Sequence, residues 1–212
     1  MSIPLFPGIR KEKYSRIAYR TQAFCRFIKK QGGFVTIRYA GTYRGQKGGK
    51  RVEEEKRRQD EEIVARQGPR VYRLAFAQLR SKADAEDVFQ EVFLRYVEKE
   101  PAFESQEHEK AWFLRVTLNC CRNVWRAPWH KRHVPLDESL PFETRDQWGL
   151  HQELLKLPPK YRVVLHLFYW EDLPAAEIGR ITGAKPAAVR QQLKRARAMM
   201  KEILEEEGLQ NV

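Results

Sequence analysis

The sequence predicts an all-α fold of two small helical domains joined by a flexible linker, the second domain being a helix-turn-helix. Apolar residues recur at helical spacing through most of residues 52–207, and no segment there alternates with the period of a strand. A proline-containing stretch divides this helical part in two. With 212 residues, of which 42% are hydrophobic, the chain can bury a core and falls outside the disordered and fibrous classes.

The net charge of +12 comes from one end of the chain. Residues 1–51 hold 13 lysines and arginines and one acid, so the rest of the chain is neutral overall. Within that rest, residues 60–110 are acidic, whereas residues 111–132 and 177–201 are basic. Such sorting indicates separate surfaces for a protein partner and for nucleic acid.

Residues 52–127 are predicted to form the first domain as nearly continuous helix. Asp84 stands where a helix N-cap is expected, in an acid-rich first turn, and a further helix is predicted over 109–126. Residues 128–149 contain three prolines and are predicted to be a flexible linker that lets the two domains move independently. The residues expected to face inward are Val88, Phe89, Val92, Phe93 and Tyr96 in the first of these helices and Trp112, Val116, Asn119 and Val124 in the second.

The second domain, predicted over residues 150–207 and followed by a tail at 208–212, carries a helix-turn-helix pattern. Pro174 opens a short helix at 175–182, Gly183 supplies a left-handed turn residue, and Pro186 suits the first turn of the next helix. That helix is basic outside an apolar stripe, which is typical of a recognition helix in a major groove; the alternative is a solvated basic helix. The stripe is Val189, Leu193, Ala196 and Met200.

Two sets of motifs resemble the second and fourth domains of bacterial RNA polymerase sigma factors. The first is Asp84-Ala-Glu-Asp-Val-Phe-Gln-Glu-Val-Phe-Leu-Arg, followed by Ala111-Trp112-Phe113-Leu114 and Asn119. The second is Leu157-Pro158-Pro159-Lys160-Tyr161-Arg162, followed by Glu177-Ile178 and the run Val189-Arg190-Gln191-Gln192-Leu193-Lys194-Arg195-Ala196-Arg197. With only these two domains, the chain is similar to the extracytoplasmic-function class of the sigma-70 type, over about residues 60–205.

The resemblance implies a factor that binds core RNA polymerase and directs it to a two-part promoter. The first domain would dock on the β′ clamp helices and read and melt the minus-ten element, and the second would contact the β flap and read the minus-35 element. The polymerase-binding residues would be Asp84, Asp87, Gln90, Glu91 and Arg95. The minus-ten residues would be Arg115, Asn119, Arg122, Asn123 and Arg126. The minus-35 residues would be Lys185, Arg190, Gln191, Lys194, Arg195 and Arg197.

These residue types fit their expected tasks. Cationic side chains track a DNA backbone, and Arg and Gln read guanine and adenine edges. Trp112 is expected in the core rather than as a base-stacking platform. Promoter DNA and core polymerase are the expected partners, and an anti-sigma factor is a further candidate.

Two other classes of function stay open from the sequence. A stand-alone helix-turn-helix regulator would bind DNA without polymerase, but it has no use for the motif at 84–97. A basic RNA- or ribosome-binding protein would depend on residues 1–51 alone.

The sequence contains no motif that indicates an enzymatic activity or a bound cofactor. No phosphate-binding loop, HExxH motif or nucleophile elbow is present. Cys120 and Cys121 are adjacent on a helix and therefore point about 100° apart, which disfavours a metal site with His130 and His133. Three cysteines without a paired pattern indicate a reduced, cytoplasmic setting, and no apolar run is long enough to insert into a membrane.

Residues 1–51 are expected to be a disordered extension. Gly48-Gly49 can be encoded by a ribosome-binding sequence, and Val52 by an alternative start codon six nucleotides downstream of it. On that hypothesis the native chain starts at residue 52. The alternative is a translated basic arm that contacts DNA or an acidic partner.

Overall fold

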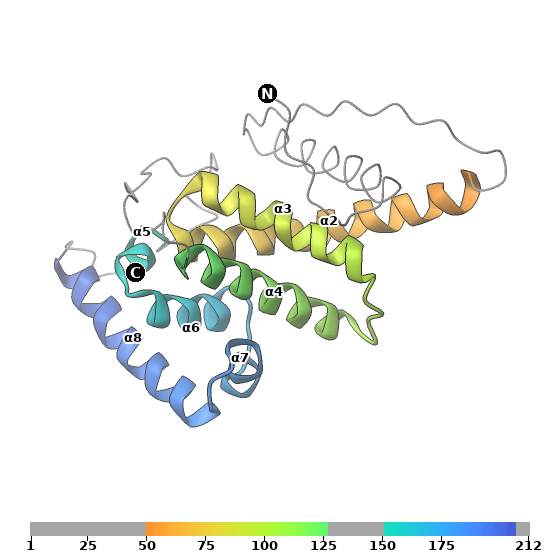
Figure 1. Ribbon diagram of the computed structural model, residues 1–212. Helices are drawn as coiled ribbons and strands as arrows, with labels where there is room; N and C mark the ends of the chain where they lie inside the picture. Colours follow the sequence, from red (N-terminus) through yellow and green to blue (C-terminus); the bar gives the residue numbers. More distant parts are fainter. Residues whose placement is uncertain (1–49, 127–150, 207–212) are drawn as a thin grey trace.

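The computed structural model describes residues 50–126 and 151–206, in which every regular element is an α-helix (Figure 1). The first domain consists of α2 (Lys50–Leu79), α3 (Lys82–Lys99) and α4 (Gln106–Arg126). The second consists of α5 (His151–Lys156), α6 (Pro159–Tyr169), α7 (Ala175–Thr182) and α8 (Pro186–Glu206). The all-α prediction is confirmed. The linker at 128–149, the tail at 208–212 and the proposed start region up to Gly49 lie outside the described residues.

The breaks between the first three helices have local causes. Arg80 adopts φ 58° and ends α2, and Glu100 adopts φ 44° and caps α3 just before Pro101. The N-cap of α3 is Ser81, whose Oγ accepts the backbone N–H of Asp84 at 3.3 Å. The prediction that Asp84 is the cap was therefore wrong, because a serine three residues earlier already satisfies that donor.

Aromatic side chains dominate the core of the first domain. The Phe113 ring lies 5.3 Å from that of Phe93 and 5.5 Å from that of Tyr96, and Trp112 packs against the same cluster, as predicted. The expectation that Asn119 faces inward was wrong: its side chain is exposed, and the inward positions beside it belong to Leu118 and Cys120.

The two domains share their apolar cores. Leu74 of α2 and Leu114 and Leu118 of α4 are buried in the cluster of the second domain, and Leu155 of α5 is buried in that of the first. Figure 1 shows the second domain lying along one side of α2 and α4. The sequence analysis considered only the linker composition and did not predict this second apolar stripe on α2 and α4. The expectation that the domains move independently stays a prediction.

Two buried charges lie where the domains meet. The Arg162 side chain, with the residue only 2% exposed, donates to Leu157 O within its own domain and to Ala77 O (2.6 Å) and Gln78 O (3.2 Å) at the end of α2. Burial, with a smaller effect from nearby Arg80, lowers its pKa to about 10, so the group stays charged at neutral pH.

Glu171 is the second buried charge. Its Oε2 pairs with Arg70 Nε of α2 at 2.5 Å and with Lys110 Nζ of α4 at 3.4 Å. The Lys110 ammonium also donates to the Glu171 carbonyl oxygen. A carboxylate of the second domain is thus neutralised by two cations of the first.

His166 of α6 is fully buried, and neither ring nitrogen has a hydrogen-bond partner among the described residues. Its ring stacks on Trp170 at 5.6 Å. Burial, helped by the nearby charge of Arg73, lowers the pKa of His166 to about 3. The folded protein therefore keeps this imidazole neutral, whereas the unfolded chain protonates it below pH 6.5, the ordinary value.

This difference predicts an acid-sensitive stability. Because only the unfolded state takes up the proton, lowering the pH from 7 to 5 should reduce the free energy of unfolding by about 2 kcal/mol through His166 alone. Urea unfolding at both pH values should show this loss in the wild-type protein and in a control, His108→Leu, whose ring is exposed. In His166→Leu the loss should be smaller by about 2 kcal/mol. An unchanged pH dependence in His166→Leu would contradict the assignment.

Candidate functional site

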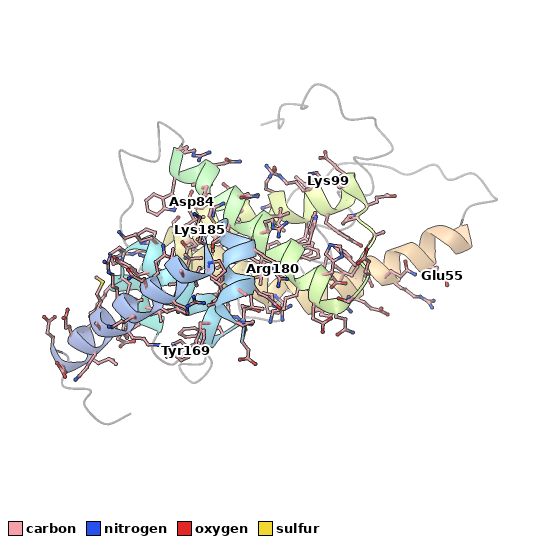
Figure 2. The ribbon with its side chains drawn as sticks, turned by 90° about the horizontal axis from the view of Figure 1, so that it is seen from below. Glu55, Asp84, Lys99, Tyr169, Arg180 and Lys185 are labelled. Carbon is pink, nitrogen blue, oxygen red and sulfur yellow. The ribbon has the colours of Figure 1, made fainter. Side chains whose placement is uncertain are left out.

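A polar face on α3 contains four of the five predicted polymerase-binding residues. Asp84, Asp87, Glu91 and Arg95 follow one another at intervals of three and four residues, which places them on one side of the helix. Figure 2 labels Asp84 and Lys99 at the two ends of α3. Gln90 is half-buried and lies on another flank, about 100° from Glu91.

The N-terminal end of this face carries two acidic residues, Asp84 and Asp87. Partial loss of hydration raises the pKa of Asp87, and the negative charge of the nearby Asp84 carboxylate is a second, smaller cause. Further along, Arg95 Nε donates to Glu91 Oε1 at 2.7 Å, which neutralises one acid of the row. The N-terminal end of this face is therefore acidic, whereas at its other end the charges of Glu91 and Arg95 neutralise each other.

A second polar face, which is basic, lies on α4. Arg115, Asn119, Arg122 and Arg126 are spaced by four, three and four residues and are all exposed, as is Asn123 on the flank. Arg122 Nη1 donates to Asn119 Oδ1 at 2.9 Å, so these two side chains form one polar unit. The structure thus brings four of the five predicted minus-ten residues onto one face.

Two of these arginines contact the second domain. Arg115 Nη2 donates to Arg180 O at 3.2 Å, and Arg122 Nη2 donates to Thr182 O at 2.8 Å. Both acceptors belong to the last turn of α7, where helix carbonyls lack intrahelical partners. The sequence did not predict this contact, because the partners are 60 or more residues apart.

The helix-turn-helix has the predicted elements. α7 ends at Gly183, which adopts φ 81° and donates its N–H to Gly179 O, and Pro186 is the first residue of α8. Figure 2 labels Arg180 on α7 and Lys185 just before α8. Val189, Leu193 and Ala196 are buried and Met200 is partly buried, so the predicted stripe is confirmed.

All six predicted minus-35 residues are exposed, but two of them also contact their own domain. Arg197 Nε donates to Tyr169 Oη at 3.1 Å, and its guanidinium lies over the Phe168 ring at 5.0 Å. A hydrogen bond from Arg195 lowers the pKa of Tyr161. The other four, Lys185, Arg190, Gln191 and Lys194, lie in the N-terminal half of the helix or just before it.

Sequence reasoning missed three features of these surfaces. Gly179 approaches the turn so closely that a Cβ built there would lie 2.7 Å from Ala184 O. The large side chains of Trp125 and Tyr169 are 39% and 58% exposed. A tryptophan within the basic stretch was the available signal for Trp125, whereas nothing in the local pattern pointed to the glycine contact.

The cysteines of α4 belong to the core. Cys120 and Cys121 are both buried thiols. Burial raises the pKa of Cys120 to about 11 and raises that of Cys121 further. Across residues 50–126 and 151–206, no group of three metal-ligating side chains is found, and no helix is long and apolar enough to cross a membrane.

Comparison with known proteins matches both domains to one family. A family model described as Sigma-70 region 2 matches residues 63–131, and one described as Sigma-70, region 4 matches residues 148–200. RNA polymerase sigma factor SigV of Bacillus subtilis is 30% identical over 144 residues, which cover 65% of this chain and 86% of that protein. The ECF RNA polymerase sigma factor SigE of Mycolicibacterium smegmatis is 29% identical over 157 residues, covering 68% of this chain and 61% of that protein.

Solved structures support the same fold. The sigma factor RpoE of Bartonella quintana, in a co-crystal with the anti-sigma factor NepR, aligns with a TM-score of 0.55 at 16% identity. This alignment covers 74% of the present chain and 98% of that one. CnrH, in complex with the cytosolic domain of CnrY, aligns with a TM-score of 0.50 at 20% identity over 90% of the present chain and 97% of that one.

The close approach at Gly179 predicts a position that tolerates no side chain. Gly179→Ala should lower the free energy of unfolding by about 1–3 kcal/mol, because its Cβ would meet a backbone oxygen that cannot rotate away. The matched control is Gly183→Asn, since asparagine visits positive φ and no atom lies within 4 Å of a Cβ there. Chemical unfolding of both variants is the measurement. Equal losses of unfolding free energy in the two variants would show that the close approach to Ala184 O does not affect stability.

Proposed function

The chain belongs to the sigma-70 family of RNA polymerase sigma factors, in the extracytoplasmic-function class, and it directs promoter-specific transcription initiation; we propose that it does so through three separate faces, on α3, α4 and α8. The single observation that carries this division is the spatial sorting of charge. The acidic residues of α3 and the basic residues of α4 and α8 lie on different helices and different exposed faces.

The α3 face binds core polymerase. Its residues are Asp84, Asp87, Glu91 and Arg95, with Gln90 on the adjoining flank, and the partner surface is the β′ clamp helices. An acidic face on a rigid helix suits a basic protein surface, because complementary charge orients the encounter. The apolar side of the same helix is buried in the core, so the polar side is the one available for docking.

The α4 face handles the minus-ten element. Arg115, Arg122 and Arg126 supply a cationic track for the backbone of the separated strand, and Asn119 and Asn123 supply amide groups for base edges. Trp125 is the exposed aromatic ring on the same helix, and it offers a surface on which an unpaired base stacks. Trp112 packs in the core instead.

The minus-35 element is read from the N-terminal part of α8, with Lys185 just before it. A recognition helix contacts base edges with its N-terminal residues, which here include Arg190, Gln191 and Lys194. Arg195 and Arg197 lie further along, and their contacts with Tyr161 and Tyr169 hold them near the domain surface. These two are suited to phosphate contacts that set the register. The β flap of polymerase is the proposed protein contact of this domain.

The protein acts by binding rather than by catalysis, and its place of action is the cytoplasm, where core polymerase and promoter DNA are found. An anti-sigma factor is a further proposed partner, because RpoE and CnrH were solved with NepR and CnrY, respectively. The stand-alone regulator is the second candidate function, and the docking face on α3 disfavours it.

Run-off transcription with purified core polymerase tests the function, and charge reversal on α3 tests the docking face. Asp87→Lys and Glu91→Lys should each weaken core binding about tenfold or more, since a like-charge contact costs several kcal/mol. Run-off product should fall in parallel. Glu107→Lys reverses an exposed acid on α4 and is the control. Unchanged co-purification of both α3 variants with core polymerase would remove α3 from the interface.

Alanine substitution on α8 tests the minus-35 assignment. Arg190→Ala should reduce promoter binding by the holoenzyme by about 1–3 kcal/mol if the guanidinium contacts a guanine edge. Arg195→Ala should weaken binding to all sequences about equally and flatten the salt dependence, as a phosphate contact does. Lys201→Ala, at a position paired with Glu205 in the last part of the helix, is the control. Wild-type promoter binding by Arg190→Ala would contradict the placement.

A further inference from the structure

We propose that Tyr169 of α6 is a ligand of the DNA backbone, which acts with Arg197 of α8 as one phosphate-binding unit beside the recognition helix. The inference deepens the proposed function and rests on it, since it adds a binding residue for the minus-35 element. Periodicity along α8 does not point to Tyr169, because this residue belongs to a different helix.

Tyr169 is the last residue of α6, and its side chain lies at the surface. The residue is 58% exposed, and Figure 2 shows it at the edge of the second domain. The next residue, Trp170, instead stacks on the buried ring of His166. A tyrosine combines an apolar ring with a hydroxyl that both donates and accepts, and such side chains contact DNA phosphates.

The guanidinium of Arg197 is held by a pair of aromatic rings and a hydroxyl. Arg197 Nε donates to Tyr169 Oη at 3.1 Å, and the guanidinium lies 5.0 Å from the centre of the Phe168 ring and 5.7 Å from that of Tyr169. The two rings meet edge to face with their centres 5.0 Å apart. These contacts restrict a long side chain that would otherwise sample many rotamers, so Arg197 loses less conformational entropy on binding.

The hydrogen bond between these two side chains leaves donors for a phosphate. Arg197 uses its Nε–H, which leaves the hydrogens on both Nη atoms in the planar fork that matches phosphate oxygens. Tyr169 Oη accepts this bond with a lone pair and keeps its own hydrogen. Because Oη and Nε are 3.1 Å apart, one phosphate group can accept from both residues.

The position of Arg197 along α8 favours the backbone over base edges. Arg190, Lys194 and Arg197 are spaced by four and three residues and lie on one side of the helix. Arg197 is about 10 Å further along the helix axis than Arg190. A recognition helix contacts bases with its N-terminal residues, and flanking groups bind the backbone. An orientation that places Arg190 at a base edge therefore brings Arg197 and Tyr169 to a strand that borders the groove.

Removal of one hydroxyl tests this unit in the holoenzyme of core polymerase and the full chain. The probe is a promoter duplex enriched by the wild-type holoenzyme from a library of randomised duplex DNA. Tyr169→Phe keeps the ring at an exposed position, and circular dichroism checks its folding. It should weaken binding of the duplex about 2- to 12-fold, which corresponds to the cost of ordering one long side chain. Lys201→Ala, one turn beyond Arg197 and paired with Glu205, is the control and should bind like the wild type.

Salt dependence and a double-mutant cycle distinguish a phosphate-binding unit from a structural role. Arg197→Ala should lower the slope of log affinity against log salt concentration by about 0.9, whereas Tyr169→Phe removes no charge and should leave this slope unchanged. In the Arg197→Ala background, Tyr169→Phe should cause a smaller loss of affinity than in the wild type, since residues that share a ligand are energetically coupled.

Neutral methylphosphonates, placed one at a time along both strands of the duplex, identify the phosphate. At one position the substitution should weaken binding by the wild type but have little effect on Tyr169→Phe and Arg197→Ala, because both variants have already lost that contact. Lys201→Ala should keep the wild-type pattern.

Three results would overturn the inference. They are wild-type affinity of Tyr169→Phe for the duplex, additive effects of Tyr169→Phe and Arg197→Ala, or a loss of core-polymerase binding by Tyr169→Phe, which would assign the ring to a protein interface. If the wild-type holoenzyme enriched no duplex, the proposed function would fall and the inference with it. An enriched duplex that Tyr169→Phe binds normally would remove the inference alone.

Discussion

The arrangement of this protein depends on the buried guanidinium group of Arg162, which the described residues surround with carbonyl acceptors and not with a carboxylate. Arg162 directs its donors to carbonyl oxygens of Leu157, Ala77 and Gln78. The last carbonyls of a helix lack intrahelical partners and carry partial negative charge, so the end of α2 provides a site that a planar cation fills. Because the acceptors come from both domains, this side chain links α6 to the end of α2.

The apolar contacts around this group determine how firmly the domains associate. Leu74, Leu114, Leu118 and Leu155 are each buried in a cluster that consists mainly of the other domain's residues. Exposing such a side chain costs about 1.5–3 kcal/mol, so separating the domains opposes several kcal/mol of burial. Any partner that separates them must bind the open form correspondingly more tightly than the closed one.

Local chemistry explains which parts of the fold could be predicted from the sequence. The helix-turn-helix was predictable because Pro174, Gly183 and Pro186 act on their own backbone within a few residues. The cap of α3 was misplaced because Asp84 and Ser81 are both good cap residues, and only the backbone geometry distinguishes them. Spacing alone also put Asn119 inside, although its neighbours in the helix are the buried residues.

The residues that make up each candidate surface could be predicted from the sequence, but the contacts that these residues make with the other domain could not. The basic face of α4 follows from four residues at helical spacing, and the resemblance to a known family gave it a DNA partner. Arg162 was visible as part of a motif, yet its acceptors lie 84 and 85 residues earlier in the chain. The helical periodicity of the sequence carries no information on which residues so far apart in the chain will form a hydrogen bond. The sequence therefore indicates which surface each residue belongs to, and only the fold shows what that surface contacts.

The same limit applies because one guanidinium can bind two different kinds of acceptor. A DNA phosphate and the C-terminal carbonyls of a helix both present clustered oxygen acceptors with negative charge, and a guanidinium binds either with the same donors. Arg122 is held by Thr182 O and by Asn119 Oδ1, so its donors are already oriented before any nucleic acid arrives. A basic residue on an exposed helix is thus not evidence of a vacant DNA site.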